Sequence, residues 1–524
     1  MADTENKGLQ LLKKGQKGIL HGIFSRLGII LLLFLLQVAC LFSIFRWFGQ
    51  FLPHVLGGTV LFIMIMVIYL LNMQMDATAK ITWLILIMMV PVLGALLLCY
   101  TQTEIGHRAL KRRIGQLIGE TKDSIPQDEA VIGKLRKEDP GTAALVNYLN
   151  RSGCFPAYEN TKVTFFPTGE DKFKELLEQL KQAKHFIFLE YFIISEGLMW
   201  GKVLEILAQK ASEGVEVRVM YDGMCEFALL SHDYPKKLAK LGIKCKMFSP
   251  ITPFVSTHYN YRDHRKILVI DGHTVFNGGI NLADEYINEV HPYGHWKDTA
   301  LMLKGDAVKS FTLMFLQMWN IDEKNCDFDT YLNVPTIPHK EAGGYVVPYA
   351  DCPLDNDKVG EDVYIDILNR AERYVHIMTP YLILDGEMEN ALKFAAKRGV
   401  DVKLILPGIP DKKAAYALAK THYASLVRAG VEIYEYTPGF VHAKIFVSDD
   451  CRAVVGTINL DYRSLYHHFE CATYLYKTDC IKQIADDYKI TLEKCRKVTT
   501  ETIKKEKLST RLTGYLMKAV APLM

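Results

Sequence analysis

Few residues in this chain form the patterns that hold metals, disulfides or nucleotides. Its 11 cysteines form no Cys-x-x-Cys pair, which indicates neither a zinc site nor a disulfide framework. Most are expected to be small buried hydrophobic residues in a reducing location. The segment that most resembles a phosphate-binding loop, residues 197–202, has the wrong spacing and is followed by Val203. Because no cluster of metal ligands is visible, we expect no metal and no other cofactor.

Charge of one sign is also scarce. The net charge is +3 and the sequence has no dense basic stripe, which disfavours a soluble nuclease and a nucleic-acid partner. No cleavage site of small residues follows a short apolar core, so apolar segments near the N-terminus are expected to be retained. Apolar residues make up 49% of the chain, which indicates a membrane component concentrated in one part of it.

That apolar part is found near the N-terminus, in three runs. They are Leu27–Phe45, Val55–Leu71 and Ile81–Tyr100. The first and third runs are long enough to cross a bilayer, and the second is marginal. We therefore predict a membrane anchor of two or three hydrophobic segments over residues 1–105. A buried helical hairpin of a soluble protein is the alternative.

Basic residues flank the apolar runs on both sides. Those before them are Lys7, Lys13, Lys14, Lys17 and Arg26, and those after them are Arg108, Lys111, Arg112 and Arg113. The positive-inside tendency places both groups in the cytoplasm, which requires an even number of crossings, so one of the three runs would be re-entrant or interfacial. We expect a multi-pass protein of the cell membrane whose remaining domains are cytoplasmic. Residues 106–155 are polar and mixed in charge, and are expected to form a helical linker.

A short motif occurs twice in the rest of the chain. The segments RDHRKILVIDGHTVFNGGIN (262–281) and VHAKIFVSDDCRAVVGTIN (441–459) both contain His-x-Lys-x4-Asp. In each copy a glycine follows the histidine by fourteen residues and an asparagine follows it by seventeen. The residues are His264, Lys266, Asp271, Gly278 and Asn281 in the first copy, and His442, Lys444, Asp449, Gly456 and Asn459 in the second. One copy would be weak evidence, but two with the same spacing favour a functional site over a solvated surface.

Each copy of the motif is expected to gather its polar groups in one pocket. The runs KILVI and KIFVS are typical of strands, in which residues two apart share a face, so the histidine and the lysine project together. A turn at the aspartate brings the Gly-x-x-Asn segment back alongside. There the glycine would let the backbone approach a ligand, and the asparagine would donate a hydrogen bond. Imidazole, ammonium and amide donors together suit a phosphate group.

The two copies lie in halves with the same order of elements. The first half has helix 171–183, strand 185–194, helix 202–211 and strand 215–223; the second has helix 363–373, strand 374–383, helix 388–397 and strand 400–408. This alternation predicts βαβ units and a partly parallel sheet, with the second half a diverged copy of the first. We predict domains at 156–335 and 336–524. Segment 508–524 has the pattern of a basic amphipathic helix, which either lies on a bilayer or packs on the core.

The paired motifs closely resemble the HKD motifs of the phospholipase D superfamily. The resemblance extends from about Trp83 to the C-terminus. Within this superfamily, GGINLADEY and GTINLDYRS resemble bacterial cardiolipin synthases. The resemblance implies two tandem phospholipase D-like α/β sandwich domains related by a pseudo-twofold axis, with one active site at their interface. It also implies phosphatidyl transfer from one phosphatidylglycerol to another in the lipid bilayer, which yields cardiolipin and glycerol.

Two histidines on opposite sides of one phosphate supply the two roles that such an exchange needs. One neutral imidazole attacks phosphorus, and a second imidazole protonates the leaving alkoxide. By the resemblance, His264 is the nucleophile that forms a phosphohistidine, and His442 is the acid and then the base. The groups expected to hold the phosphate oxygens are Lys266, Lys444, Asn281 and Asn459. The motif aspartates, Asp271 and Asp449, belong to the signature, but their position at strand ends favours turn and ion-pair roles over catalysis.

Each histidine also needs an acceptor for its other ring nitrogen. We expect Glu470, on the strand that follows the second motif, to orient His442, and Asp298, in the matching strand of the first half, to orient His264. His468 receives no role.

Other functions remain open at this point. One is a phospholipase D or another phosphatidyltransferase that uses a different alcohol as acceptor. Another is a non-catalytic membrane scaffold, against which the intact histidine, lysine and asparagine residues of both motifs argue.

Overall fold

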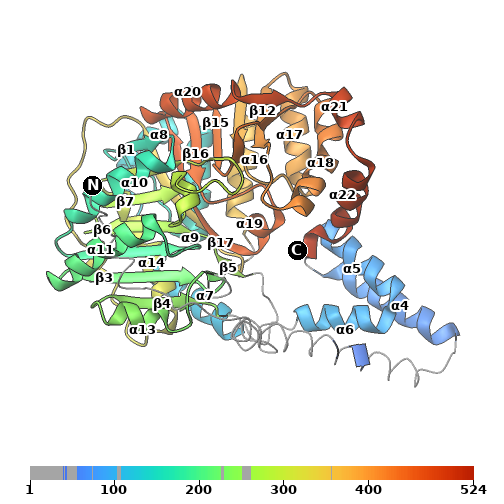
Figure 1. The fold of residues 1–524 in the computed structure, drawn as a ribbon, viewed down its shortest axis with the longest axis horizontal. Coiled ribbons are helices and arrows are strands. Elements are labelled where there is room, and N and C mark those ends of the chain that lie inside the picture. Colours follow the sequence, from blue (N-terminus) through green and yellow to red (C-terminus); the bar gives the residue numbers. More distant parts are fainter. Residues whose placement is uncertain are drawn as a thin grey trace, which may run out of the picture.

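Two α/β halves follow one another along the chain (Figure 1). The structure is a computed structural model that describes residues 39, 42–43, 56–73, 75–102, 108–225, 229–250, 261–355 and 357–523. The elements of the first half are β1 (Lys162–Phe166), α10 (Gly169–Lys181), β2 (Phe186–Tyr191), α11 (Leu198–Ser212), β3 (Glu216–Asp222), α13 (Tyr234–Ala239), β4 (Lys244–Phe248), β5 (Arg262–Asp263), β6 (Lys266–Ile270), β7 (Thr274–Gly278), η1 (Asp284–Ile287), β8 (His295–Lys297), β9 (Ala300–Lys304), α14 (Val308–Trp319), η2 (Asn320–Asp322) and α15 (Asp329–Leu332).

The second half repeats this order of elements. They are β10 (Tyr345–Asp351), α16 (Val359–Arg370), β11 (Tyr374–Met378), α17 (Gly386–Lys397), β12 (Asp401–Pro407), α18 (Lys413–Arg428), β13 (Glu432–Tyr436), β14 (Gly439–Val441), β15 (Ile445–Ser448), β16 (Arg452–Gly456), α19 (Tyr462–Tyr466), β17 (His468–Tyr476), α20 (Cys480–Leu492), β18 (Cys495–Lys497), α21 (Thr500–Lys504), α22 (Leu508–Val520) and η3 (Ala521–Leu523).

Each half folds into a sheet with the same strand order. The first sheet runs β1-β9-β7-β6-β2-β3-β4, and the second runs β10-β17-β16-β15-β11-β12-β13-β18. In each sheet the three strands that alternate with helices are parallel, β2 with β3 and β4 in one and β11 with β12 and β13 in the other. The other neighbouring pairs within these two strand orders are antiparallel. The predicted tandem repeat of one α/β unit is therefore confirmed.

The central strands are apolar along their whole length because both faces of the sheet are covered. Every residue of β2 and of β6 is buried, which is the pattern of a sheet with elements packed on both sides. One face of the first sheet forms a core with Leu176 of α10 and Leu204 of α11. The other face packs on Phe315 of α14 and shares a continuous core with the second half. The two sheets thus form one body.

Two short strands cross between the halves. β5 of the first half pairs in parallel with β17 of the second, with Arg262 opposite His468. In the mirrored contact, β14 of the second half pairs in parallel with β8 of the first, with Val441 opposite Lys297. β5 and β14 each end just before a motif histidine, so each half places its histidine on the other half's backbone.

The apolar segments near the N-terminus form α4 (Leu56–Asn72), α5 (Ala77–Met89) and α6 (Pro91–Gln102). The third predicted run is not a single helix, because it breaks between Val90 and Pro91, a residue without a backbone N–H that here begins α6. Among the described residues, no helix is both long and apolar enough to cross a bilayer. Most of the run Leu27–Phe45 and the basic residues before it lie outside the described residues.

The segment expected to be a linker consists of three helices that pack on the core. These are α7 (Arg108–Thr121), α8 (Glu129–Glu138) and α9 (Pro140–Gly153). Leu135 and Leu149 belong to the same core as the second sheet. The Arg113 guanidinium donates hydrogen bonds to the carbonyl oxygens of Asn320 and Glu323 at 3.1 and 2.9 Å. The linker is therefore helical, and its helices contact both halves.

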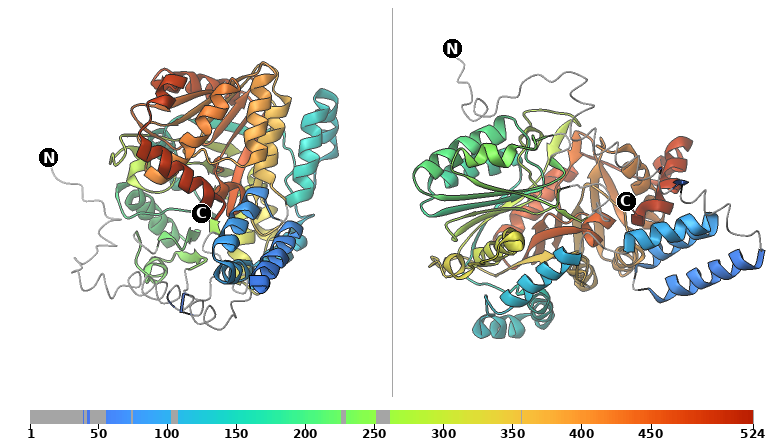
Figure 2. Two further views of the ribbon diagram at one scale, coloured as in Figure 1. Left: turned by 90° about the vertical axis from the view of Figure 1, so that its right-hand side faces the viewer. Right: turned by 90° about the horizontal axis from the view of Figure 1, so that it is seen from below.

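The C-terminal helix α22 packs on α18 and leaves its apolar residues exposed. Gly514 makes this contact possible, since a Cβ atom there would lie 2.4 Å from the carbonyl oxygen of Ala417. The hydroxyl of Thr82 in α5 donates to the carbonyl oxygen of Ala519 at 2.9 Å, so the N-terminal helices lie beside α22, as both views of Figure 2 show. One side of the helix therefore packs on the core, as one of the two alternatives predicts, and its leucines face outward.

Candidate active site

The motif aspartates close the hairpins that carry the motif. Asp271 and Asp449 have φ angles of 49° and 54°, the left-handed conformation of a tight turn. The carboxylate of Asp271 accepts three backbone N–H groups at the start of β2, at distances of 2.7–2.8 Å. The carboxylate of Asp449 accepts the matching three groups at the start of β11, each at 2.9 Å. Both aspartates thus lock the sheet beneath the site and hold no reacting group.

The motif glycines bring strands together rather than a ligand, contrary to the expectation from their spacing. Gly278 has φ of +148°, and a Cβ atom there would lie 2.6 Å from the Cα of Ala300 in β9. At Gly456 a Cβ atom would lie 2.5 Å from the Cα of Ala472 in β17. Strand β17 carries the Glu470 carboxylate, and β9 begins two residues after Asp298. The close approach of each strand to its glycine therefore sets the position of the carboxylate that orients a histidine.

Each motif histidine bonds a carboxylate from the other half of the protein. His264 Nδ1 lies 2.9 Å from both Glu470 oxygens, and His442 Nδ1 lies 2.7 Å from Asp298 Oδ2. The expected partners are therefore exchanged: we predicted Asp298 for His264 and Glu470 for His442. The prediction assumed a neighbour in the same sheet, whereas the crossing strands carry each histidine to the opposite half.

Backbone hydrogen bonds explain this exchange. The His264 N–H donates to the carbonyl oxygen of Phe469 at 2.9 Å, directly before Glu470. The His442 N–H donates to the carbonyl oxygen of Lys297 at 2.7 Å, directly before Asp298. A histidine bonded to the residue before the acid has its ring beside that acid. The same local geometry is built twice, once from each half.

The two asparagines are not equivalent. Asn281 is fully engaged in structure, because its Oδ1 accepts the Ile193 N–H at 3.0 Å and its Nδ2 donates to the Tyr286 hydroxyl at 2.7 Å. Asn459 is buried, and its Oδ1 finds no hydrogen-bond partner among the described residues. The Asn281 amide thus fixes Tyr286 beside His442. An amide oxygen only accepts hydrogen bonds, so the phosphate contact expected of Asn459 would have to use its Nδ2 donor.

Three buried lysines surround the histidines. Lys266 and Lys444 each donate to the carbonyl oxygen of the motif histidine two residues before, at 2.5 Å. Lys172 of α10 donates to the carbonyl oxygen of Ile280 at 3.3 Å. None of the three ammonium groups forms an ion pair with a carboxylate of the described residues. Buried unpaired cations at one place call for an anionic ligand.

Lys172 was missed in the sequence. A signal was nevertheless available, because Lys172 falls on the same helical face as the buried residues Leu176 and Leu180. A lysine on the buried face of a helix either extends its side chain so that the ammonium group reaches solvent, or places that group in a buried binding site.

Burial and mutual repulsion lower the pKa of these lysines. Burial lowers the pKa of Lys266 to about 8, and nearby carboxylates offset only part of that shift. Burial lowers the pKa of Lys444 to about 7, and the charge of Lys266 adds to the shift. The same two causes lower the pKa of Lys172 to about 7, although Asp298 opposes them. An anion bound among the three lysines would restore their charge.

Both histidines are neutral in the substrate-free site at pH 7. Burial lowers the pKa of His264 well below its usual range, with Lys266 adding to the effect and Glu470 opposing it. Burial and Lys444 lower the pKa of His442 to about 4. If His264 were protonated, its charge would hold the pKa of Glu470 low. Burial disfavours that protonated state of His264. A neutral imidazole has a free lone pair with which it can attack, and an anion bound beside either ring would raise the pKa of that ring.

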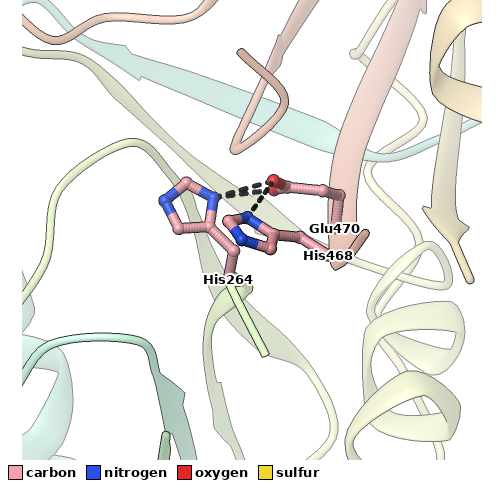
Figure 3. Close-up of side chains that lie close together, drawn as sticks. All are labelled: His264, His468 and Glu470. Carbon is pink, nitrogen blue, oxygen red and sulfur yellow. Dashed lines mark hydrogen bonds and ion pairs between the residues drawn. The ribbon is translucent and has the colours of Figure 1, made fainter. Parts of the chain in front are cut away.

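Aromatic rings shape the two sides differently. The His264 ring lies 4.9 Å from that of Phe192 and 5.3 Å from that of His468, between centroids. Figure 3 shows His264, His468 and Glu470 grouped together. The His442 ring lies 5.4 Å from each of the rings of Tyr286 and Trp296. The rings of Phe192, Tyr286 and Trp296 limit the orientation of the two imidazoles and exclude bulk water, which strengthens electrostatic interactions within the site.

The sequence matches the family described as "Cardiolipin synthase, PLD-like domain" over residues 176–319 and 364–491. These ranges include both histidines and both orienting acids. The chain belongs to this family.

Individual relatives agree with that assignment. The chain is 32% identical to a cardiolipin synthase of Alkalihalophilus pseudofirmus, with 91% of this chain and 95% of the relative covered. It is 61% identical to an uncharacterized protein of Streptococcus mutans, with 87% and 99% covered. Its fold is similar to that of a phosphatidylserine synthase from Haemophilus influenzae, with a TM-score of 0.53, 14% identity, and 69% of this chain and 93% of that one covered. Membership in the cardiolipin synthase family makes the chain a phosphatidyltransferase of the phospholipase D superfamily.

In this member of the cardiolipin synthase family, His264 is paired with Glu470 and His442 with Asp298. These pairs predict which histidine responds when each acid is replaced. In Glu470→Gln, the His264 Nδ1–H bond loses its charged acceptor, so that proton's NMR resonance should move upfield while the His442 resonance stays in place. Asp298→Asn should have the opposite effect. Each variant should lose at least about 100-fold in activity, since the orientation of an acid–base imidazole is impaired. If Glu470→Gln shifted only the His442 resonance, the couples would be assigned wrongly.

The lowered lysine pKa values predict an alkaline limit to substrate capture. As pH rises through about 7 to 8, Lys444 and Lys266 lose the charge that binds phosphate, so kcat/KM should fall. The limit in kcat should lie at higher pH, because bound phosphate stabilises both ammonium groups. Lys444→Arg keeps its charge and is the matched control. A kcat/KM that stays constant to about pH 9.5 would contradict the assigned role of the lysines.

Proposed function

We propose that this protein is a cardiolipin synthase that transfers a phosphatidyl group from one phosphatidylglycerol to a second. The observation that carries the proposal is the duplicated histidine–carboxylate couple, built across the interface of two homologous halves and surrounded by unpaired buried lysines. Such a site offers two imidazoles and three cations to one phosphodiester. The named activity of the relatives supports the choice of lipid substrate.

In the first step, His264 attacks the phosphorus of the donor lipid. His264 carries its proton on Nδ1, where the carboxylate of Glu470 accepts the hydrogen bond, so that Nε2 has a free lone pair. The bond from phosphorus to the glycerol oxygen breaks while Nε2 binds phosphorus. His442 donates a proton to the departing oxygen, and the phosphatidyl group remains on His264. The negative phosphodiester raises the pKa of His442 on binding, which supplies the acid form.

In the second step, His442 acts as a base. It takes a proton from a hydroxyl of the second phosphatidylglycerol, whose oxygen attacks phosphorus as the bond to Nε2 breaks. One phosphodiester is exchanged for another of similar energy, so no nucleotide is consumed. Lys266, Lys444 and Lys172 stabilise the charge that develops on the equatorial oxygens, and the Asn459 amide supports them. Asn281 acts through Tyr286 rather than on the phosphate.

Incubating purified enzyme with phosphatidylglycerol as its only lipid should produce cardiolipin and glycerol in equal amounts, measured by lipid mass spectrometry. His264→Ala and His442→Ala should each abolish turnover. With a phosphatidyl donor whose leaving group needs no proton, His442→Ala should accumulate an adduct on His264, found by peptide mass spectrometry.

Two other results would redirect the assignment. Phosphatidic acid as the main product would indicate a phospholipase D, and transfer only to an added alcohol would indicate another phosphatidyltransferase. An adduct elsewhere with His264 unmodified would refute its role as nucleophile. Full activity in either alanine variant would refute the mechanism with two histidines, and a wild type that forms no product would favour the scaffold interpretation.

Contact with the bilayer is part of the proposal. Apolar side chains are exposed on α4, on α5 and on α22, and the hydrogen bond from Thr82 to Ala519 places α5 and the end of α22 together. The exposed residues of α22 include Leu512 and Leu516, at 54% and 72%. We infer that this corner of the molecule meets the lipid surface, and that residues 1–105 contribute the anchor. The basic residues on both sides of the apolar runs support a cytoplasmic location.

Charged substitutions in α22 test this contact. The double variant Leu512→Asp and Leu516→Asp should lose at least about tenfold in activity on phosphatidylglycerol vesicles, because each buried leucine contributes about 1.5–3 kcal/mol. Its activity on substrate in detergent micelles should be unchanged. The control is Ile490→Asp, an equally exposed apolar residue of α20. Equal loss on vesicles and micelles would mean that α22 supports only the fold.

A further inference from the structure

A third histidine lies beside the His264 couple and has no part in the proposed reaction. His468 is 7% exposed, and within the described part of the chain neither of its ring nitrogens makes a hydrogen bond. Its Nδ1 lies 3.6 Å from Glu470 Oε1, which is too long for a hydrogen bond. A buried imidazole whose ring nitrogens make no hydrogen bond, and whose Nδ1 has only this long contact with a carboxylate, needs an explanation.

His264, His468 and Glu470 together have the geometry of a transition-metal site. One ligand atom from each lies within 4.8 Å of the others. Zinc ligands lie about 2.0–2.2 Å from the ion, so two of them at a tetrahedral angle are about 3.4 Å apart. The two separations from Glu470, 2.9 Å to His264 Nδ1 and 3.6 Å to His468 Nδ1, lie on either side of that value. Figure 3 shows the two rings on the same side of the carboxylate.

A cavity provides a route for a cation to this cluster. His468 lines a cavity of about 680 Å³ between the loop before α5 and the second half of the protein. The cavity is also lined by Asp76, Asp355, Asp357 and Glu387, and among the described residues Lys358 is the one lysine or arginine in its wall. Carboxylates along the wall attract divalent cations and raise their local concentration. The cluster is thus buried but open to a small ion on one side.

We propose that His264, His468 and Glu470 form an inhibitory site for a transition-metal dication of the zinc class. Two imidazoles and one carboxylate are a common zinc ligand set that leaves a fourth position open, whereas magnesium prefers oxygen ligands. The proposal rests on the proposed function in one respect: inhibition follows because His264 reacts through Nε2.

The inhibition has a direct chemical cause. A metal on His264 Nδ1 takes the lone pair at that nitrogen, so the proton that Nδ1 carried moves to Nε2. A protonated Nε2 has no lone pair with which to attack phosphorus. The ion also occupies the Glu470 carboxylate that orients the ring. The metal causes no covalent change in the protein. Removing it with a chelator therefore restores activity.

Zinc titration of the full-length enzyme, freed of metal with chelator and held in detergent, tests the site. The wild type should bind one zinc ion, measured by competition with a chromophoric chelator, and should lose phosphatidyl transfer in proportion. Magnesium at the same concentration should leave activity unchanged. His468→Asn should retain activity but bind zinc at least about tenfold more weakly, since even indirect partners of a metal contribute that much. His291→Asn, at an exposed position, is the matched control.

The binding and activity readouts separate the possible failures. If zinc inhibited His468→Asn at the wild-type concentration, or if the wild type bound no zinc ion tightly, the proposed site would be overturned. If zinc bound through His468 while the wild type formed no cardiolipin, the metal site would stand and the substrate assignment would fall. Zinc binding through His468 without loss of transfer would refute the inhibitory role.

Discussion

The structure of the site depends on a single constraint: each half of the protein must hold the other half's histidine. Strands β5 and β14 cross the interface, and each ends at the residue directly before a motif histidine. The backbone bonds of His264 to Phe469 and of His442 to Lys297 then bring each ring to an acid. Docking of the two halves and assembly of the catalytic groups are therefore one event. The shared core along this interface stabilises both at once.

The buried cations are the main destabilising feature that the fold tolerates. Lys172, Lys266 and Lys444 are each at most 2% exposed, the charge of Lys266 repels the other two, and none of the three forms an ion pair with a carboxylate of the described residues. Such an arrangement costs folding free energy in the empty site, and a bound phosphodiester relieves that cost. The site is thus complementary to a charged ligand that the folded protein lacks, which is how binding energy becomes available for catalysis.

Much of the fold and of the motif could be predicted from local pattern. The His-x-Lys-x4-Asp copies and the alternation of strands and helices are short-range features, and they correctly indicated a repeated α/β unit. The partners of the histidines could not be read in this way, because His264 and Glu470 are 206 residues apart and only the crossing strands join them. Lys172 did carry a local signal, its place on the buried face of α10, but its position beside the motif lysines depends on the fold. The break at Pro91 was a local signal that the apolar run obscured.

The crossing strands also restrict how a lipid can reach the phosphate site. Because β5 and β14 each pair one half with the other, a hinge movement that parted the sheets would break both histidine–carboxylate couples together. Substrate therefore cannot enter by such an opening, and its headgroup has to reach the two histidines while the halves stay closed.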